Sequence, residues 1–177
     1  GHPYKPEQQI DPLGVYGATK AAGEQAIAEV LGLDQGGNAA VVRTSWVYSP
    51  VGSNFLLTML RLHRQKAEAD EPLKVVADQV GCPTSTVGLT RACWRLVERR
   101  LGGLMHWSDA GAATWYDFAV AIGELAEASG RLDRAAQVLP ISTVDYPTPA
   151  QRPAYSLLDC SSSREQLGLI PKHWHQA

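Results

Sequence analysis

Two residues near the start of the chain, Tyr16 and Lys20, have the types and the spacing needed to deliver a proton to a carbonyl group. A spacing of four residues puts both side chains on one face of a helix, one turn apart. A phenol ionises poorly at neutral pH, but an ammonium group beside it favours the phenolate. The pair therefore predicts a general acid for a carbonyl that receives a hydride. The alternative is a solvated tyrosine–lysine pair without function, because this spacing also arises by chance in helices.

A second feature is the polar and aromatic segment that follows an apolar run. Residues 39–43 are mainly apolar, and residues 44–48 read Thr-Ser-Trp-Val-Tyr. Ligands in open α/β sheets bind at the carboxyl ends of the strands. We therefore expect the segment at 44–48 to lie near a ligand site.

The elements that position these residues are expected to alternate between helix and strand. Hydrophobic periodicity and turn residues predict helices at 11–31, from 53–54 onward, at 86–101, 114–128 and 161–167, and strands at 39–48, 73–76, 104–107 and 138–141. This alternation indicates an α/β fold with parallel strand pairing.

Several of these elements should be buried. Asp11 as N-cap and Pro12 at the first helical position predict where the first helix begins. The strand at 39–48 is expected to be covered on both faces. The residues expected to point inward are Val15, Ala18, Ala22, Ala26, Ile27, Val30 and Leu31 on the first helix, and Leu89, Cys93, Leu96 and Val97 on the helix at 86–101.

Composition excludes several classes of function. The chain has 177 residues, 45% of them hydrophobic and 19% charged, and a formal net charge of −2 without a basic run. These values give no electrostatic reason to expect a nucleic-acid or membrane-surface partner. No apolar stretch reaches the roughly 18–20 residues that a membrane span needs, and the first residues do not resemble a signal peptide. We therefore expect a soluble, cytoplasmic protein.

The cysteines and histidines do not predict a metal site. Cys82, Cys93 and Cys160 form no C-x-x-C pair, and His173 and His175 have no cysteine or carboxylate cluster near them in sequence. The cysteines are expected to be small apolar residues that fill space in a reducing compartment.

Five sequence blocks in a fixed order resemble the dTDP-4-dehydrorhamnose reductases, a family of the extended short-chain dehydrogenases/reductases. The resemblance extends from residue 3 to about residue 168. The blocks are D-P-L-G-V-Y-G-x-x-K-x-x-G-E at 11–24, R-T-S-W-V-Y at 43–48, N-F-x-x-T-M-L at 54–60, D-Q-x-G-x-P-T at 78–84 and R-P-x-x-S-x-L-D at 152–159.

The resemblance implies a role for each matching residue. Tyr16 would donate the proton to the 4-keto oxygen of the sugar, and Lys20 would hold the nicotinamide ribose of NADPH or NADH and help Tyr16 to ionise. Trp46 would lie against the sugar, with a tryptophan of the strand core as the alternative. Weaker candidates for the nucleotide or sugar pocket are Asn54, Gln79 and Arg152, of which Arg152 could grip a phosphate or be purely structural.

The implied fold is a Rossmann-type doubly wound parallel sheet, its N-terminal part missing, with a smaller α/β substrate lobe. Residues 1–50 would belong to the dinucleotide-binding domain, and residues 51–177 mainly to the substrate lobe, with segments that return to the Rossmann domain. No glycine-rich fingerprint follows a strand in the chain. We therefore expect an incomplete, inactive fragment that binds dinucleotide poorly by itself.

The implied reaction is the NAD(P)H-dependent reduction of dTDP-4-dehydro-L-rhamnose to dTDP-L-rhamnose. A related nucleotide-sugar epimerase or dehydratase is one alternative, because these enzymes share Y-x-x-x-K. A non-catalytic relative that binds a partner protein is another, although it would have no need of the Tyr16 and Lys20 pair. The choice between NADH and NADPH stays open, as does the oligomeric state, for which a homodimer is one alternative.

Overall fold

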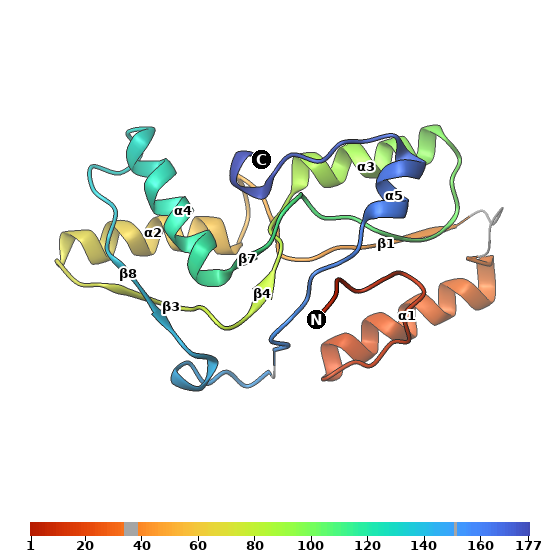
Figure 1. Cartoon of the computed structure of the whole chain (residues 1–177), viewed down its shortest axis with the longest axis horizontal. Helices are drawn as coiled ribbons and strands as arrows, with labels where there is room; N and C mark the ends of the chain where they lie inside the picture. The colour runs from red at the N-terminus through yellow and green to blue at the C-terminus, as the bar shows by residue number, and fades with distance from the viewer. Residues whose placement is uncertain (34–38, 151) are drawn as a thin grey trace.

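A computed structural model describes residues 1–33, 39–150 and 152–177 of the chain. Helices and strands alternate in it, which confirms the α/β class (Figure 1). The helices are α1 (Val15–Leu31), α2 (Phe55–Glu68), α3 (Thr86–Glu98), α4 (Trp115–Ala128) and α5 (Ser161–Leu167), with short 3-10 turns η1 (Thr143–Asp145) and η2 (Trp174–Gln176). The strands are β1 (Ala40–Arg43), β2 (Val47–Tyr48), β3 (Leu73–Val76), β4 (Val80–Gly81), β5 (Thr84–Ser85), β6 (Gly103–His106), β7 (Ala113–Thr114) and β8 (Val138–Ile141).

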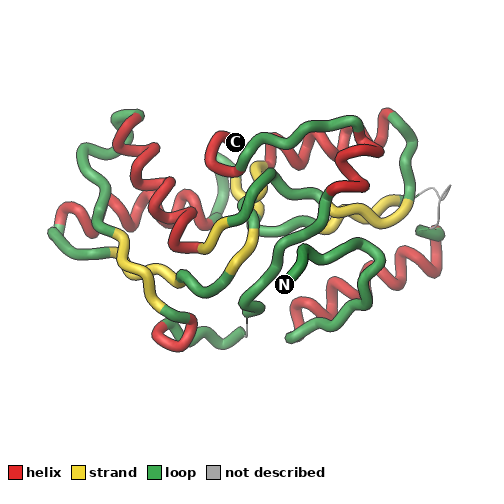
Figure 2. The backbone as a smooth tube through the Cα atoms, in the orientation of Figure 1, coloured by secondary structure: helices red, strands yellow, loops and turns green. Residues whose placement is uncertain are grey.

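The strands form pairs, most of them parallel. β1 pairs with β6, β2 with β5 and β3 with β8 in parallel, while β4 and β7 are antiparallel. The predicted parallel pairing is therefore confirmed, although the described residues form two-stranded ladders rather than one wide doubly wound sheet. Figure 2 shows these short strands joined by long loops.

The strand predicted at 39–48 is two strands, not one. β1 ends at Arg43 and β2 begins at Val47, because Trp46 between them has a φ of 48°. This left-handed backbone conformation cannot continue an extended strand. The predicted burial on both faces was also wrong, since the residues of β1 are only half-buried and Val47 is exposed.

Two hydrophobic clusters lie at different places along the molecule. One packs α2 and α4 against β3, and its buried members include Met59, Leu73, Phe118 and Ile122. The other joins α3, β6 and α5. In Figure 1 the first cluster belongs to the end that carries α2, α4, β3 and β8, which we call the cavity lobe, and α1 lies toward the opposite end.

Helix α1 differs from its prediction at its start and in its packing. It begins at Val15, and its N-cap is Gly14 rather than Asp11. No residue of α1 is buried, so the predicted inward face was wrong, and Val15 and Val30 are 82% and 79% exposed. The physical reason is that no described element packs on that face. The turn predicted at 34–38 lies outside the described residues.

The other helices agree closely with their sequence signals. Asn54 caps α2, and a capping box formed by Thr114 and Asp117 begins α4. The prediction for α3 was wrong at Cys93 and Val97, which are exposed. Buried Ala92 marks the inward face of α3, and Cys93 is one residue further round the helix, about 100° away from it.

Candidate functional site

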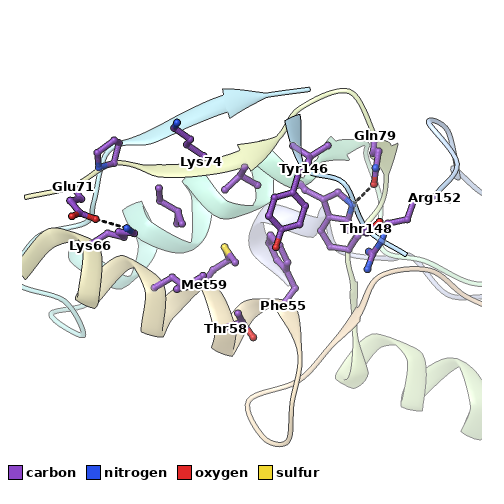
Figure 3. Close-up of a pocket in the computed structure, with 16 residues that line it drawn as sticks. Phe55, Thr58, Met59, Lys66, Glu71, Lys74, Gln79, Tyr146, Thr148 and Arg152 are labelled. Carbon is purple, nitrogen blue, oxygen red and sulfur yellow. Dashed lines mark hydrogen bonds and ion pairs between the residues drawn. The ribbon is translucent and has the colours of Figure 1, made fainter. Parts of the chain in front are cut away.

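A cavity of about 800 Å³ lies in the cavity lobe between α2, β3 and the segment that follows η1. Figure 3 shows Gln79 and Arg152 at one end of this cavity, and Lys66 and Glu71 at the other. The lining residues are Phe55, Thr58, Met59, Leu62, Lys66, Glu71, Pro72, Leu73, Lys74, Val75, Val76, Gln79, Trp115, Tyr146, Thr148 and Arg152. Two of the predicted pocket residues, Gln79 and Arg152, are therefore brought together.

Asn54 shapes the cavity rather than lining it. Its Oδ1 accepts a hydrogen bond from the Leu57 backbone N–H, and its Nδ2 donates to the carbonyl oxygens of Ser49 and Val51. These bonds fix the first turn of α2 and the loop before it. This first turn begins with Phe55, which lines the cavity. Both ends of the Asn54 amide are thus used within the chain.

The α2 sequence explains which side chains reach the cavity. Phe55, Met59, Leu62 and Lys66 recur at spacings of three and four residues, so they share one face of the helix. The buried His63 points instead toward α4, where its Nε2 lies 2.9 Å from the carbonyl oxygen of Ala119. One face of α2 is therefore available to a ligand while another anchors the helix.

Cationic groups are distributed along the cavity. Lys66 Nζ forms an ion pair with Glu71 at 2.5 Å. The hydrogen bond from Lys66 lowers the pKa of the exposed Glu71 carboxyl group. Within the described parts of the chain, Lys74 and Arg152 form no ion pair. Their charges remain available for an anionic ligand.

Gln79 is buried, and its amide connects two other lining elements. Its Oε1 accepts a hydrogen bond of 3.1 Å from Trp115 Nε1, and its Nε2 donates one of 3.1 Å to Thr143 Oγ1. Thr143 in turn donates to the carboxylate of Asp78. This bonding lowers the pKa of Asp78, so the carboxylate stays ionised at neutral pH.

Trp46 lies behind the cavity wall. Its indole stacks on that of Trp115, with ring centroids 3.6 Å apart and an interplanar angle of 12°. Among the described residues it is Trp115 that lines the cavity, and Trp46 does not. The structure therefore places the predicted sugar-contacting tryptophan next to the site, with one face covered by a second tryptophan.

Tyr16 and Lys20 come together as the four-residue spacing predicts, but outside the cavity. Lys20 Nζ lies 5.3 Å from the centroid of the Tyr16 ring, over its face. Tyr16 is 78% exposed, and neither residue lines the cavity. The first turn of α1 points toward the middle of the molecule in Figure 1. The Tyr16–Lys20 pair and the cavity are thus two separate groups of residues in the described chain.

Sequence reasoning missed several lining residues. Trp115 directly follows the helix cap Thr114. An aromatic residue at the first position of a helix is the only sequence signal that could have pointed to it as a ligand contact. Tyr146 lies in a proline-bearing loop, and Lys74 interrupts an apolar strand. These residues carry no motif of their own, because their role depends on which elements meet in space.

Two kinds of site, a metal centre and a membrane span, are absent from the described residues. No group of three or more His, Cys, Asp or Glu side chains among them could hold a metal ion. None of the helices in the described ranges is both long enough and apolar enough to cross a membrane.

The sequence model of the RmlD substrate binding domain matches residues 1–177. The chain is 39% identical to the spore coat polysaccharide biosynthesis protein SpsK of Bacillus subtilis (strain 168), over 99% of this chain and 56% of SpsK. It is 38% identical to a dTDP-4-dehydrorhamnose reductase of Sinorhizobium fredii, over 99% of this chain and 58% of that protein.

A solved structure shows the same similarity in three dimensions. The dTDP-4-dehydrorhamnose reductase of Bacillus anthracis, determined in complex with NADP, superposes with a TM-score of 0.85 at 33% identity, over 98% of this chain and 57% of that one. The chain thus spans a little over half the length of these relatives.

Proposed function

Because the chain belongs to the RmlD substrate-binding-domain family, we propose that it carries the sugar-nucleotide site and the acid–base pair of an NAD(P)H-dependent reductase. The reaction is the reduction of the 4-keto group of dTDP-4-dehydro-L-rhamnose to dTDP-L-rhamnose. The observation that carries the proposal is the cavity, whose lining combines aromatic rings with cationic side chains. The relatives that support it are named as dTDP-4-dehydrorhamnose reductases.

The chemistry of the lining suits a nucleoside diphosphate joined to a sugar. Phe55, Trp115 and Tyr146 offer rings for a base or for the apolar face of a sugar. Arg152 and Lys74 offer positive charge to the two phosphates, and arginine can bind a phosphate with two parallel hydrogen bonds. The cavity volume of about 800 Å³ is within the range of small-molecule sites.

Tyr16 supplies the proton in this proposal. Negative charge develops on the 4-keto oxygen as the carbonyl carbon is reduced, and the Tyr16 hydroxyl donates its proton to that oxygen. The Lys20 ammonium, 5.3 Å from the ring centroid, then stabilises the phenolate that remains. Both side chains are exposed, so the pair is accessible to a substrate.

NADPH or NADH, when bound, supplies the hydride. Tyr16 and Lys20 fit the nicotinamide ribose, because both are exposed and Lys20 has no ion pair in the described ranges. The pyrophosphate needs backbone amides of a glycine-rich loop, and the sequence contains no such fingerprint. We therefore assign to this chain only the nicotinamide end of the cofactor site.

The test is turnover by this chain joined to the dinucleotide-binding half of a relative. The assay supplies dTDP-4-dehydro-L-rhamnose and NADPH and follows both nicotinamide absorbance and the sugar product. We expect one NADPH oxidised for each dTDP-L-rhamnose formed. Interconversion of sugar nucleotides without net NADPH consumption would instead indicate an epimerase, and no conversion of any sugar nucleotide would contradict an enzymatic role.

A further inference from the structure

The wall at the Gln79 end of the cavity is built from stacked aromatic rings. Trp115, the first residue of α4, lines the cavity and has Trp46 stacked on it at 3.6 Å between ring centroids. Phe55 approaches the same indole at 4.6 Å with a tilt of 46°. The position of the Trp115 ring is thus set by aromatic neighbours contributed by two distant segments of the chain.

A directional series of hydrogen bonds fixes the orientation of the Trp115 indole. The ionised Asp78 carboxylate can only accept, so the Thr143 hydroxyl donates to it and keeps its oxygen free to accept. The Gln79 NH₂ group donates to that oxygen, which leaves Gln79 Oε1 to accept from Trp115 Nε1. Each donor and acceptor in the series has one consistent assignment.

Trp46 is held against Trp115 by the segment at 81–84. Its carbonyl oxygen accepts a hydrogen bond of 3.1 Å from the Thr84 N–H, and its left-handed φ of 48° breaks the extended backbone between β1 and β2. A Cβ atom on Gly81 would lie 2.5 Å from Trp46 Cε2, so only glycine fits beside the ring. The glycine of the D-Q-x-G-x-P-T block is therefore needed for the stack.

We propose that Trp115 is the sugar-positioning residue of the cavity, and that Gln79 and Trp46 act through it. This inference rests on the proposed function. In Figure 1 the Phe55 end of α2 faces the middle of the molecule, toward the first turn of α1, and the other end of α2 lies furthest from α1. A sugar that must reach Tyr16 therefore occupies the Gln79 end, where Trp115, hydrogen-bonded to Gln79, forms the wall.

Circular dichroism tests the stack without any ligand. Two indoles stacked at this distance couple their transitions and give a paired positive and negative band in the far-ultraviolet spectrum. We expect Trp115→Phe and Trp46→Phe each to abolish this band, and Gln79→Leu to weaken it. Trp94→Phe is the matched control, because Trp94 is 63% exposed on α3 and outside the stack. A band that survives Trp115→Phe would overturn the inference.

Titration calorimetry tests the positioning role, with dTDP and dTDP-L-rhamnose as probes. We expect Trp115→Ala to weaken the binding of dTDP-L-rhamnose about tenfold and that of dTDP less than about twofold. The reason is that only dTDP-L-rhamnose carries the rhamnose that would contact the Trp115 ring. Trp115→Phe should recover part of the lost affinity for dTDP-L-rhamnose. Gln79→Leu should weaken dTDP-L-rhamnose binding selectively, as Trp115→Ala does, but by a smaller factor. Thermal unfolding of each variant identifies any that fail to fold, in which case Trp115→Phe carries the test.

The outcomes separate this inference from the function on which it rests. Wild-type affinity for dTDP-L-rhamnose in Trp115→Ala, or an equal loss for both probes, would overturn the role of Trp115 and leave the proposed function standing. Failure of the wild-type chain to bind either probe would overturn the proposed function itself, and with it the positioning role.

Discussion

The cavity lobe and helix α1 are held in place by different kinds of interaction. In the cavity lobe, α2 and α4 bury large side chains such as Met59, Phe118 and Ile122 in a common core. Helix α1 buries no residue, and a bidentate ion pair between Glu24 and Arg43 attaches it to β1. The groups that line the cavity are therefore held by packing, whereas the helix that carries Tyr16 and Lys20 is held by polar contacts.

The largest expected effect is on the chemistry of α1. Tyr16→Phe keeps the ring and removes only the hydroxyl, so kcat should fall by about 10²–10⁴ in the complete reductase, the usual contribution of a general acid. Because the side chain is 78% exposed, the free energy of unfolding should not change measurably. Steady-state kinetics and urea unfolding check both points, with Tyr4→Phe as control. A variant that keeps more than about a third of the wild-type kcat would remove Tyr16 from its role.

The attachment of α1 can be broken separately. Arg43 Nε donates to both carboxylate oxygens of Glu24, its Nη2 donates to Oε2, and its Nη1 donates to the carbonyl oxygen of Pro6. Both side chains of the pair are about one-fifth exposed. Arg43→Gln should lower the free energy of unfolding by about 1–3 kcal/mol, the cost of a half-buried charge left without its partner.

Hydrogen exchange shows where the Arg43→Gln effect acts. The α1 amides should exchange faster in this variant while those of α2 and α4 stay protected. Equal acceleration in both regions would show that α1 and the cavity lobe are not held independently.

A pair of glycines compares the packing of the two regions directly. A Cβ atom on Gly123 of α4 would lie 2.6 Å from the buried His63 ring, whereas nothing lies within 4 Å of one on Gly23 of α1. Gly123→Ala should therefore destabilise by about 1–3 kcal/mol through overpacking. Gly23→Ala should stabilise by about 0.5–1 kcal/mol, because alanine favours the helix. Chemical denaturation measures both, and the same sign for the two variants would contradict the comparison.

The smallest expected effect is a change in the pH dependence of stability, near the point where α1 is attached to β1. Burial first, and then the positive charge of Arg43, lower the pKa of His106. The unfolded chain therefore binds this proton more readily, and stability should fall as the pH decreases from about 6.5 toward the lowered pKa. His106→Gln should flatten this dependence below about pH 6.5. An unchanged slope in denaturation measurements would assign the dependence to other groups.

Much of the cavity lobe could be predicted from sequence, because its signals are local. The cap at Asn54 and the capping box at Thr114 determine where α2 and α4 begin, and β3 and β8 have the predicted bounds. The break at Trp46 could not be predicted, since the contacts that hold its left-handed backbone come from the distant residues Gly81 and Thr84.

Within the candidate site, the arrangement of residues was predictable where it depends on local helical spacing. The spacing of Tyr16 and Lys20 is enough to bring them together on α1. The position of Trp115 in the cavity wall is not visible in sequence, because it depends on Gln79, Trp46 and Phe55 arriving from three other segments. Sequence thus predicts the placement of the Tyr16–Lys20 pair better than it predicts the shape of the cavity.

The most direct test of the cavity as the sugar-nucleotide site is a calorimetric titration of this chain with dTDP-L-rhamnose. The Arg152→Ala and Arg95→Ala variants are titrated in the same way. Arg152 lines the cavity, whereas Arg95 lies on α3 and pairs with Glu98 at the surface. We predict saturable binding at one site per chain, weakened about tenfold or more by Arg152→Ala and unchanged by Arg95→Ala. Absence of binding, or equal affinity in wild type and Arg152→Ala, would contradict the assignment of the cavity as the sugar-nucleotide site.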